Sequence, residues 1–375
     1  MINFENRLKS LKNRRQGTRE RAIVESMDLF SMGKALQDGS DIRATESFET
    51  LKETPGVKYA IGAMASVDSK STELSIKEGN RVADSLIKSL TNQGEPVLSK
   101  LQGSVALDIH IKGYSDVDML IIVRNTINTE TPEIVPNNYL PSTDHRSLIE
   151  IIRDVRNKSE NILSRNFPKV DVDCSGNKSI ALCGGSLLRK VDIVPAIWYD
   201  SLQYQRSREE HDRGIKIYHK SDHGFILNYP FTHIKKVNDQ DSHYAGNLKC
   251  VIRLMKNMIA DMPDYKKCIA NKLSSYDLAS IGYHMNNNLS LPYYMRLGLV
   301  EKIRAHLDLL LCVESYRNSL NVPDGSRKIF DDNCKVDALE ILTNEFGDLA
   351  VSIFKELRPL QGNYDSSVLI DKVIA

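Results

Sequence analysis

The chain has 375 residues, of which 41% are apolar and 26% charged, and its formal net charge is +1. This composition is that of an ordinary globular protein and excludes disordered and collagen-like chains. At about 150 residues per domain, the length predicts two or three domains or one bilobal unit. The balanced charge argues against a sequence-independent coat for nucleic acid, which needs a large excess of basic residues.

The sequence also argues against a membrane or secreted protein. Even the longest unbroken apolar stretches are short, such as Met119–Val123, so we expect no segment to span a bilayer. The N-terminus lacks the apolar region of a signal peptide. Six cysteines are scattered without a Cys-x-x-Cys pair, which indicates reduced thiols rather than a disulfide framework or a zinc site. We therefore expect a cytoplasmic protein with no membrane partner.

Residues 1–92 are predicted to form an N-terminal helical region. Within it, Ser75–Glu78 has the pattern of a capping box and precedes an apolar stripe with helical spacing. Asn92–Pro96 then contains the glycine and proline that end a helix. We expect this region to pack on both lobes of the remaining chain.

The pattern changes at residues 93–205, where short runs rich in β-branched residues are typical of buried strands. The predicted strands are Asp116–Val123, Ser179–Cys183 and Lys190–Val194, and a helix is expected over 145–166. From about residue 240 onward the pattern is helical, with breaks at prolines. The fold class is therefore predicted to be α+β, with a sheet lobe at 93–205 and a helical lobe at 206–375.

Two carboxylates mark the start of the first predicted strand. Asp116 and Asp118 are two residues apart, so their side chains share one face of the strand, about 6.6 Å apart along the backbone. Two carboxylates this close repel each other unless a cation lies between them. The alternative is a strand end with two solvated aspartates, and the Asp-x-Asp pattern alone does not decide between the two.

Two further features favour the cation. Gly103 allows the backbone to approach a phosphate closely, and Ser104 adds a hydroxyl donor beside it. Asp192 is a third carboxylate, and it is flanked by apolar residues where a charge without a partner is costly. Three carboxylates on adjacent strands beside a glycine–serine turn predict a site for two Mg²⁺ ions and phosphoryl chemistry, in which Mn²⁺ can substitute.

These residues resemble a known signature. Leu101–Ser104, the spacer, Asp116–Asp118 and the later Asp192 are similar to the nucleotidyltransferase motif of the DNA polymerase β superfamily. Val194–Ala196 after the third aspartate resembles the branch that contains oligoadenylate synthetases and cyclic GMP-AMP synthase. Gln102 departs from the apolar residue usual in the superfamily. The resemblance implies a bilobal fold in which Asp116, Asp118 and Asp192 bind the metal ions.

The helical lobe carries a second resemblance. Lys256 follows Lys249 and Arg253 on one face of a predicted helix, and a serine–serine–tyrosine turn with Ser275 and Tyr276 comes later. In cyclic GMP-AMP synthase-like enzymes, residues at these positions bind the nucleotide. The resemblance therefore implies that Gly103, Ser104, Lys256 and Ser275 hold the triphosphate and that Tyr276 stacks on a base. From the residues alone, a solvated helix face and a half-buried core tyrosine remain the alternatives.

Animal cyclic GMP-AMP synthase binds DNA through a zinc insert with clustered histidine and cysteine. No histidine and cysteine cluster in this sequence has the spacing of a zinc site, so the resemblance does not imply activation by double-stranded DNA. The sequence most resembles the bacterial cGAS/DncV-like nucleotidyltransferases (CD-NTases) of antiphage CBASS systems. The resemblance implies NTP substrates including ATP, a cyclic di- or trinucleotide second messenger, and CBASS accessory proteins as partners. The alternatives are a transferase that makes linear oligonucleotides or modifies a tRNA or protein acceptor, and an inactive nucleotide-binding scaffold.

The C-terminal segment allows two interpretations. Residues 361–367 are polar and turn-rich, so the tail that ends in Ala375 could be reached by a conjugating partner of the kind that the resemblance implies. The apolar side chains of 368–374 favour the other interpretation, a tail that packs on the body of the protein. We expect the packed tail.

Overall fold

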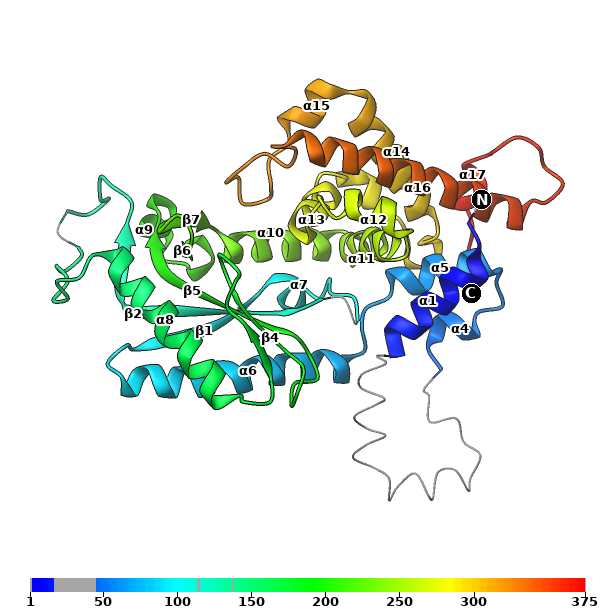
Figure 1. Ribbon diagram of the computed structural model, residues 1–375. Coiled ribbons are helices and arrows are strands. Elements are labelled where there is room, and N and C mark those ends of the chain that lie inside the picture. The colour runs from blue at the N-terminus through cyan, green and yellow to red at the C-terminus, as the bar shows by residue number, and fades with distance from the viewer. Residues whose placement is uncertain (1, 17–44, 113–114, 137, 375) are drawn as a thin grey trace, which may run out of the picture. The chain divides into compact units, whose positions relative to one another are not determined.

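The computed structural model describes residues 2–16, 45–112, 115–136 and 138–374. These residues form two compact units, which are described separately (Figure 1). The sheet unit comprises 68–108 and 115–238, and the helical unit comprises the remaining described residues. None of the helices in the described ranges has the length and apolar character needed to cross a membrane.

The sheet unit is built around one seven-stranded mixed sheet with the order β1-β2-β5-β4-β3, in which β6 pairs with β5 and with β7. β2 and β5 are parallel and every other pair is antiparallel. The elements are β1 (Val97–Gln102), β2 (Val117–Thr129), β3 (Asp171–Asp173), β4 (Ile180–Cys183), β5 (Val191–Asp200), β6 (Gly214–His219), β7 (Gly224–Asn228), α6 (Ser69–Asn92), α7 (Gly103–Ala106), α8 (Leu148–Asn166), α9 (Leu202–Ser207) and the 3-10 helix η1 (Glu210–Asp212).

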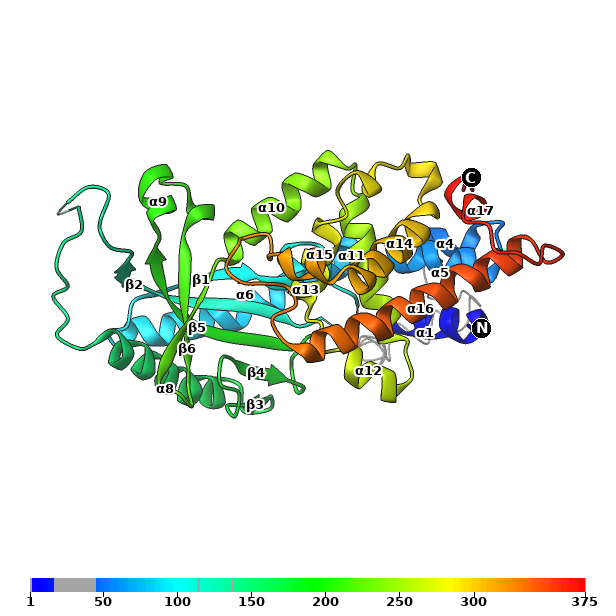
Figure 2. The ribbon, with the colours of Figure 1, turned by 90° about the horizontal axis from the view of Figure 1, so that it is seen from above.

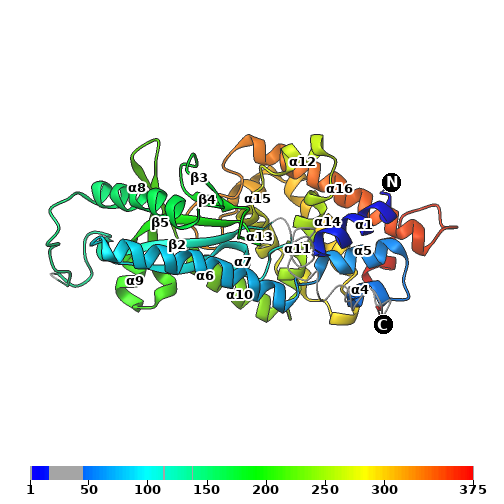
Figure 3. The same ribbon diagram turned by 60° about the horizontal axis from the view of Figure 1, so that its bottom comes forward.

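The two faces of this sheet have different partners because side chains alternate along each strand. On one face, Val117, Met119 and Ile121 of β2 join the core formed with α6 and α8, which run across the sheet in Figures 1 and 3. On the other face, Leu120 and Ile122 pack with apolar residues of β5 and β6 in a second, smaller core. Asp118 is two residues before Leu120 and therefore points to the same face of β2, opposite α6 and α8.

The helix α6 begins earlier than the sequence pattern predicts. Asp68 is its N-cap and accepts a hydrogen bond from the Ser71 amide, whereas Ser75 lies inside the helix and donates its hydroxyl to the Ser71 carbonyl, 3.0 Å away. The predicted capping box at Ser75–Glu78 is therefore wrong. The helix end at Asn92 is confirmed.

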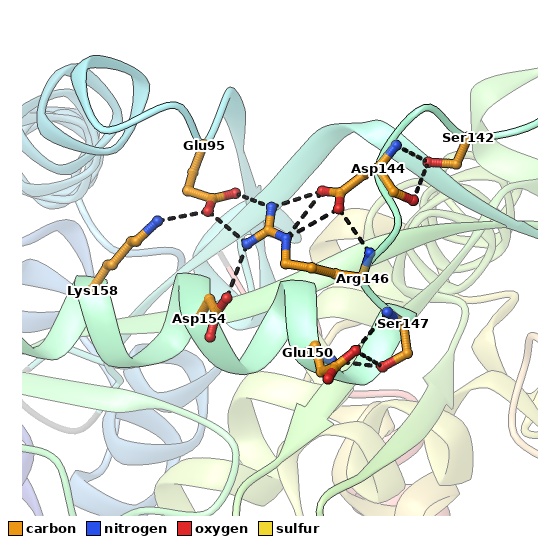
Figure 4. A network of polar contacts seen from close by, with 8 residues as sticks. All are labelled: Glu95, Ser142, Asp144, Arg146, Ser147, Glu150, Asp154 and Lys158. Carbon is orange, nitrogen blue, oxygen red and sulfur yellow. Dashed lines mark hydrogen bonds and ion pairs between the residues drawn. The ribbon is translucent and has the colours of Figure 1, made fainter.

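An arginine-centred network joins α8 and the segment before it to Glu95, which precedes β1 (Figure 4). Arg146 donates to Glu95 and Asp154, each at 2.9 Å, and to Asp144 at 2.7 Å. Lys158 of α8 donates to the same Glu95 carboxylate at 2.6 Å. Hydrogen bonds from Arg146 lower the pKa of Asp144 to about 2. Burial acts to raise the pKa of Glu95, but its bonds to Arg146 and Lys158 outweigh burial and lower it.

The helical unit is dominated by the long antiparallel neighbours α14 and α16, seen together in Figure 2. Its elements are α1 (Phe4–Gln16), α4 (Ser47–Thr50), α5 (Pro55–Met64), α11 (Asn247–Ala260), α12 (Asp264–Ala270), α13 (Ser275–Tyr283), η2 (Asn286–Leu289), η3 (Tyr293–Met295), α14 (Gly298–Cys312), α15 (Glu314–Ser319), α16 (Asn333–Leu357) and α17 (Ser367–Ile370). The helix α10 (Pro230–His243) starts in the sheet unit and ends in this one.

The C-terminal tail packs on the helical unit. Leu369 of α17 is fully buried, and the Ile374 amide donates to the Tyr294 carbonyl at 2.8 Å. Lys372 forms an ion pair with Glu53 at 2.8 Å. These contacts agree with the packed-tail prediction up to Ile374.

The units differ from the predicted domain boundaries at both ends of the sheet lobe. The sheet unit includes α6, which the sequence analysis placed in the N-terminal region at 1–92. It also extends past 205 to include β6 and β7, which continue the sheet from β5. The residues 109–112 belong instead to the helical unit.

Candidate active site

The predicted aspartates meet where β2 and β5 run side by side. In the parallel register of these strands, Asp118 is opposite Asp192, and Val117 is opposite Val191. Asp116 immediately precedes β2 and is therefore next to Lys190, the residue before β5. The structure thus brings the three predicted carboxylates to the same end of two neighbouring strands.

The three carboxylates have unequal surroundings. Asp116 accepts a hydrogen bond from the Lys190 ammonium at 2.6 Å, and its side chain is 35% exposed. Asp192 is only 16% exposed and lies 3.5 Å from the same ammonium. Burial raises the pKa of Asp192, although Lys190 opposes this shift. The Asp192 Oδ1 atom is buried and has no hydrogen-bond partner.

Gly103 lies directly against the Asp118 carboxylate. It follows β1, whose last residue Gln102 is opposite Asp118, and it adopts a left-handed φ of +73°. A Cβ atom at this position would be 2.2 Å from the Asp118 Oδ2 atom. Glycine is therefore required both by the backbone conformation and by the carboxylate beside it. Ser104, the next residue, is buried with 9% exposure.

The side chains of this site are of the type that binds a divalent cation, but they are not gathered around a single point. Within the described ranges, no three acidic, histidine or cysteine side chains gather around one point as metal ligands do. The carboxylates are instead occupied in part by Lys190. The buried Asp192 Oδ1 atom, which accepts no hydrogen bond, is the kind of hard oxygen ligand that Mg²⁺ prefers. We conclude that the donor set fits Mg²⁺ or a similar ion.

Lys256 lies on α11 of the helical unit and is buried. Its ammonium donates to the Ile109 carbonyl at 3.0 Å, and only 8% of the residue is exposed. Arg253, one turn earlier, is also buried and donates to the Met64 carbonyl at 2.8 Å. The alternative of a solvated basic helix face is therefore wrong for these two residues.

The predicted serine–serine–tyrosine turn is the beginning of α13. Ser274 is the N-cap and forms a capping box with Asp277, whereas Ser275 is the first helical residue and is exposed. Tyr276 donates its hydroxyl to Asp324, and the Arg327 guanidinium lies 5.7 Å from its ring centroid. Burial, followed by the negative charge of Asp324, raises the pKa of Tyr276.

The structure thus brings five predicted residues together in the sheet unit and places Lys256, Ser275 and Tyr276 in the helical unit. Sequence reasoning missed two of their partners. Lys190 could have been found, because it is two residues before Asp192 and so shares its strand face. Asp324 had no comparable signal, because its contact with Tyr276 joins two segments far apart in the chain.

Comparison with known proteins identifies relatives over nearly the whole chain. A cyclic dinucleotide synthase, CdnE, from Yersinia aleksiciae is 34% identical over 364 residues, which cover 94% of this chain and 93% of the relative. The solved STING-associated CdnE c-di-GMP synthase from Capnocytophaga granulosa is 26% identical with a TM-score of 0.67, covering 94% of this chain and 99% of that one.

A second solved structure shares the fold. The STING-associated CdnE c-di-GMP synthase from Flavobacteriaceae sp. has a TM-score of 0.70 at 24% identity, over 94% of this chain and 99% of its own. None of the protein-family models matches the sequence. The similarity to the Yersinia relative nevertheless extends across both units, and the fold is that of the solved synthases. The chain therefore belongs to the bacterial cGAS/DncV-like nucleotidyltransferases, enzymes that synthesise cyclic oligonucleotides, as the sequence analysis predicted.

Proposed function

We propose that this enzyme joins two nucleoside triphosphates into a cyclic dinucleotide that acts as a second messenger in antiphage signalling. The observation that supports this most directly is the pairing of Asp118 with Asp192 beside Gly103, in a chain similar to a cyclic dinucleotide synthase. The names of the relatives favour a product with two nucleotides over one with three. Curated relatives from C. granulosa, 30% identical, and from Flavobacteriaceae sp., 26% identical, are c-di-GMP synthases, so we propose GTP as a substrate, with ATP as the second candidate.

The proposed catalytic roles belong to residues of the sheet unit. Asp116, Asp118 and Asp192 bind the metal ions, for which we propose Mg²⁺, and Asp192 helps to deprotonate the attacking ribose hydroxyl. Bound Mg²⁺ supplies positive charge that stabilises the negative charge developing on the phosphates. Gly103, which has no side chain, leaves room for the Asp118 carboxylate. The attacking oxygen forms a bond to the α-phosphorus, and the bond to pyrophosphate breaks.

The remaining predicted residues are proposed to bind the triphosphate and the base of the nucleotide. Gly103, Ser104, Lys256 and Ser275 hold the triphosphate, and Tyr276 provides a flat face for stacking with a base. The exposed position of Ser275 and the fixed orientation of Tyr276 through Asp324 support these roles. CBASS accessory proteins are the proposed partners.

The test is mass spectrometry of the products formed from single NTPs and from all pairs, with Mg²⁺ and no added acceptor. We expect a cyclic dinucleotide that contains guanine and that is absent with Asp118→Asn. A transferase for tRNA or protein would give no small product. A scaffold would release no pyrophosphate from any NTP with Mg²⁺ or Mn²⁺. Linear oligonucleotides alone would overturn the cyclic product but not the nucleotidyl transfer.

A further inference from the structure

A lysine ammonium lies between two of the proposed metal ligands. The Lys190 Nζ atom is 2.6 Å from Asp116 and 3.5 Å from Asp192. The parallel register fixes this proximity, because the Val117 amide donates to the Lys190 carbonyl at 3.0 Å and holds the two strand starts together. Lys190 and Asp192 share a strand face, so the lysine reaches both carboxylates from one side.

From this arrangement we propose that Lys190 is a built-in counter-cation that competes with the divalent metal for Asp116 and Asp192. The inference rests on the proposed function, since it requires that these carboxylates bind a metal ion. Without the metal, the ammonium compensates the clustered negative charge. When the metal binds, Lys190 leaves, because two cations cannot occupy the same space between the carboxylates.

The exposed fractions of the two side chains indicate that Lys190, rather than Asp192, moves when the metal binds. The Lys190 side chain is 41% exposed, so its ammonium can turn into solvent, whereas Asp192 is 16% exposed and is held within the sheet. The ammonium is a distant partner for Asp192, because it lies 3.5 Å from the buried Oδ1 atom, which forms an ion pair with it but accepts no hydrogen bond. A divalent ion would bind that oxygen directly.

An ordinary surface ion pair is the alternative, and such pairs contribute little to stability. A surface ion pair and a competing lysine differ in their effect on the affinity of the site for metal. A competing lysine weakens metal binding, so its removal strengthens binding. A lysine that is only a surface partner leaves metal affinity unchanged, and one that supports the metal site weakens binding when it is removed.

The test is Mn²⁺ binding to the nucleotide-free protein, followed by electron paramagnetic resonance of free Mn²⁺, in wild type and Lys190→Met. Methionine keeps an unbranched side chain and removes the charge. The matched control is Lys220→Met, because Lys220 has a similar side-chain exposure of 38% and pairs with Glu160 at 2.8 Å, outside the site. Thermal unfolding in EDTA and in MgCl₂ provides a second readout.

We expect Lys190→Met to lower the Kd for Mn²⁺ by about tenfold. Its melting temperature in EDTA should fall, and the increase on adding Mg²⁺ should be larger than in wild type. Lys220→Met should change neither the Kd nor this increase. An unchanged or higher Kd in Lys190→Met, or no detectable binding in either protein, would overturn the proposal.

Failure of the proposed function gives a different result. If Asp118→Asn binds Mn²⁺ as tightly as wild type and wild type releases no pyrophosphate from NTPs, the carboxylates are not the metal site. If pyrophosphate is released but Lys190→Met gains no metal affinity, the enzyme assignment holds and the counter-cation proposal fails.

Discussion

The Asp118 carboxylate occupies the space that a side chain at Gly103 would need. A Cβ atom on Gly103 would be 2.2 Å from Asp118 Oδ2, much closer than non-bonded atoms approach. From the sequence alone, Gly103 is explained by the close approach of its backbone to a phosphate. The structure adds a second reason, because only a residue without a Cβ atom leaves room for the carboxylate of this proposed metal ligand.

Gly103→Ala should therefore displace Asp118 and lower the rate of pyrophosphate release by about a hundredfold, since displacements of about 1 Å can have effects of this size. Gly94→Ala is the matched control. Gly94 has a similar φ of +80°, but nothing lies within 4 Å of its Cβ position. Both variants should lose about 1 kcal/mol of stability from the left-handed backbone. Equal activity in the two variants would show that Gly103 does not position Asp118.

The role of Ser275 can be separated from that of its neighbour. Ser274 caps α13, so Ser274→Ala should cost about 1 kcal/mol of stability with little change in KM for NTP. Ser275 is exposed, so Ser275→Ala should leave stability unchanged and raise KM about fivefold, the effect of losing one neutral hydrogen bond. Thermal unfolding and initial rates measure both. A rise in KM for Ser274→Ala alone would mean that the wrong serine has been assigned.

Lys256→Met should weaken nucleotide binding more than Ser275→Ala, because a charge-assisted hydrogen bond is stronger than a neutral one. The burial of Lys256 adds a second effect. Its removal deprives the Ile109 carbonyl of a donor and should cost about 1–3 kcal/mol of stability. Lys249→Met, on the same helix, is the control. Loss of stability with unchanged NTP affinity, measured by calorimetric titration, would make Lys256 a structural residue only.

Tyr276 should act through its ring rather than its hydroxyl. Tyr276→Phe loses the hydrogen bond to Asp324 but keeps the stacking face, so nucleotide affinity should change by less than about threefold. Tyr276→Ala removes the face and should weaken binding at least tenfold, since stacking contributes about 1–3 kcal/mol per base. If Tyr276→Ala lowers the melting temperature and leaves affinity unchanged, Tyr276 is a core residue.

The Arg146 network predicts a dependence of stability on pH. The pKa values of Asp144 and Glu95 are lowered in the folded protein, Asp144 to about 2. Their contribution to stability is therefore complete above the unfolded pKa values of about 4 and is lost as pH falls through the folded values. Arg146→Met should lower the melting temperature at pH 7 by a few degrees, and its difference from wild type should shrink between pH 5 and pH 2. A constant difference over this range would contradict the assignment.

The sequence by itself determined the chemistry of the site. The two-residue spacing of Asp116 and Asp118 puts both on one strand face whatever the strand pairs with, because the period of a strand is local. The sequence likewise predicted the buried strands at 116–123 and 190–194 and the helix at 145–166. The spacing of apolar residues within a short segment is enough to indicate its secondary structure. The family followed from the same motif and is confirmed by the relatives.

Tertiary structure decided which residues meet. The opposition of Asp118 and Asp192 depends on the parallel register of β2 and β5, and register is set by hydrogen bonds between segments far apart in the sequence. The burial of Lys256 depends in the same way on contact with Ile109. The strands β6 and β7 were missed, although Ile215 and Ile217 alternate with polar residues, because their place beside β5 is a long-range property. Lys190 illustrates both cases. Its position on the same strand face as Asp192 follows from their two-residue spacing, whereas its contact with Asp116 depends on the pairing of β2 with β5.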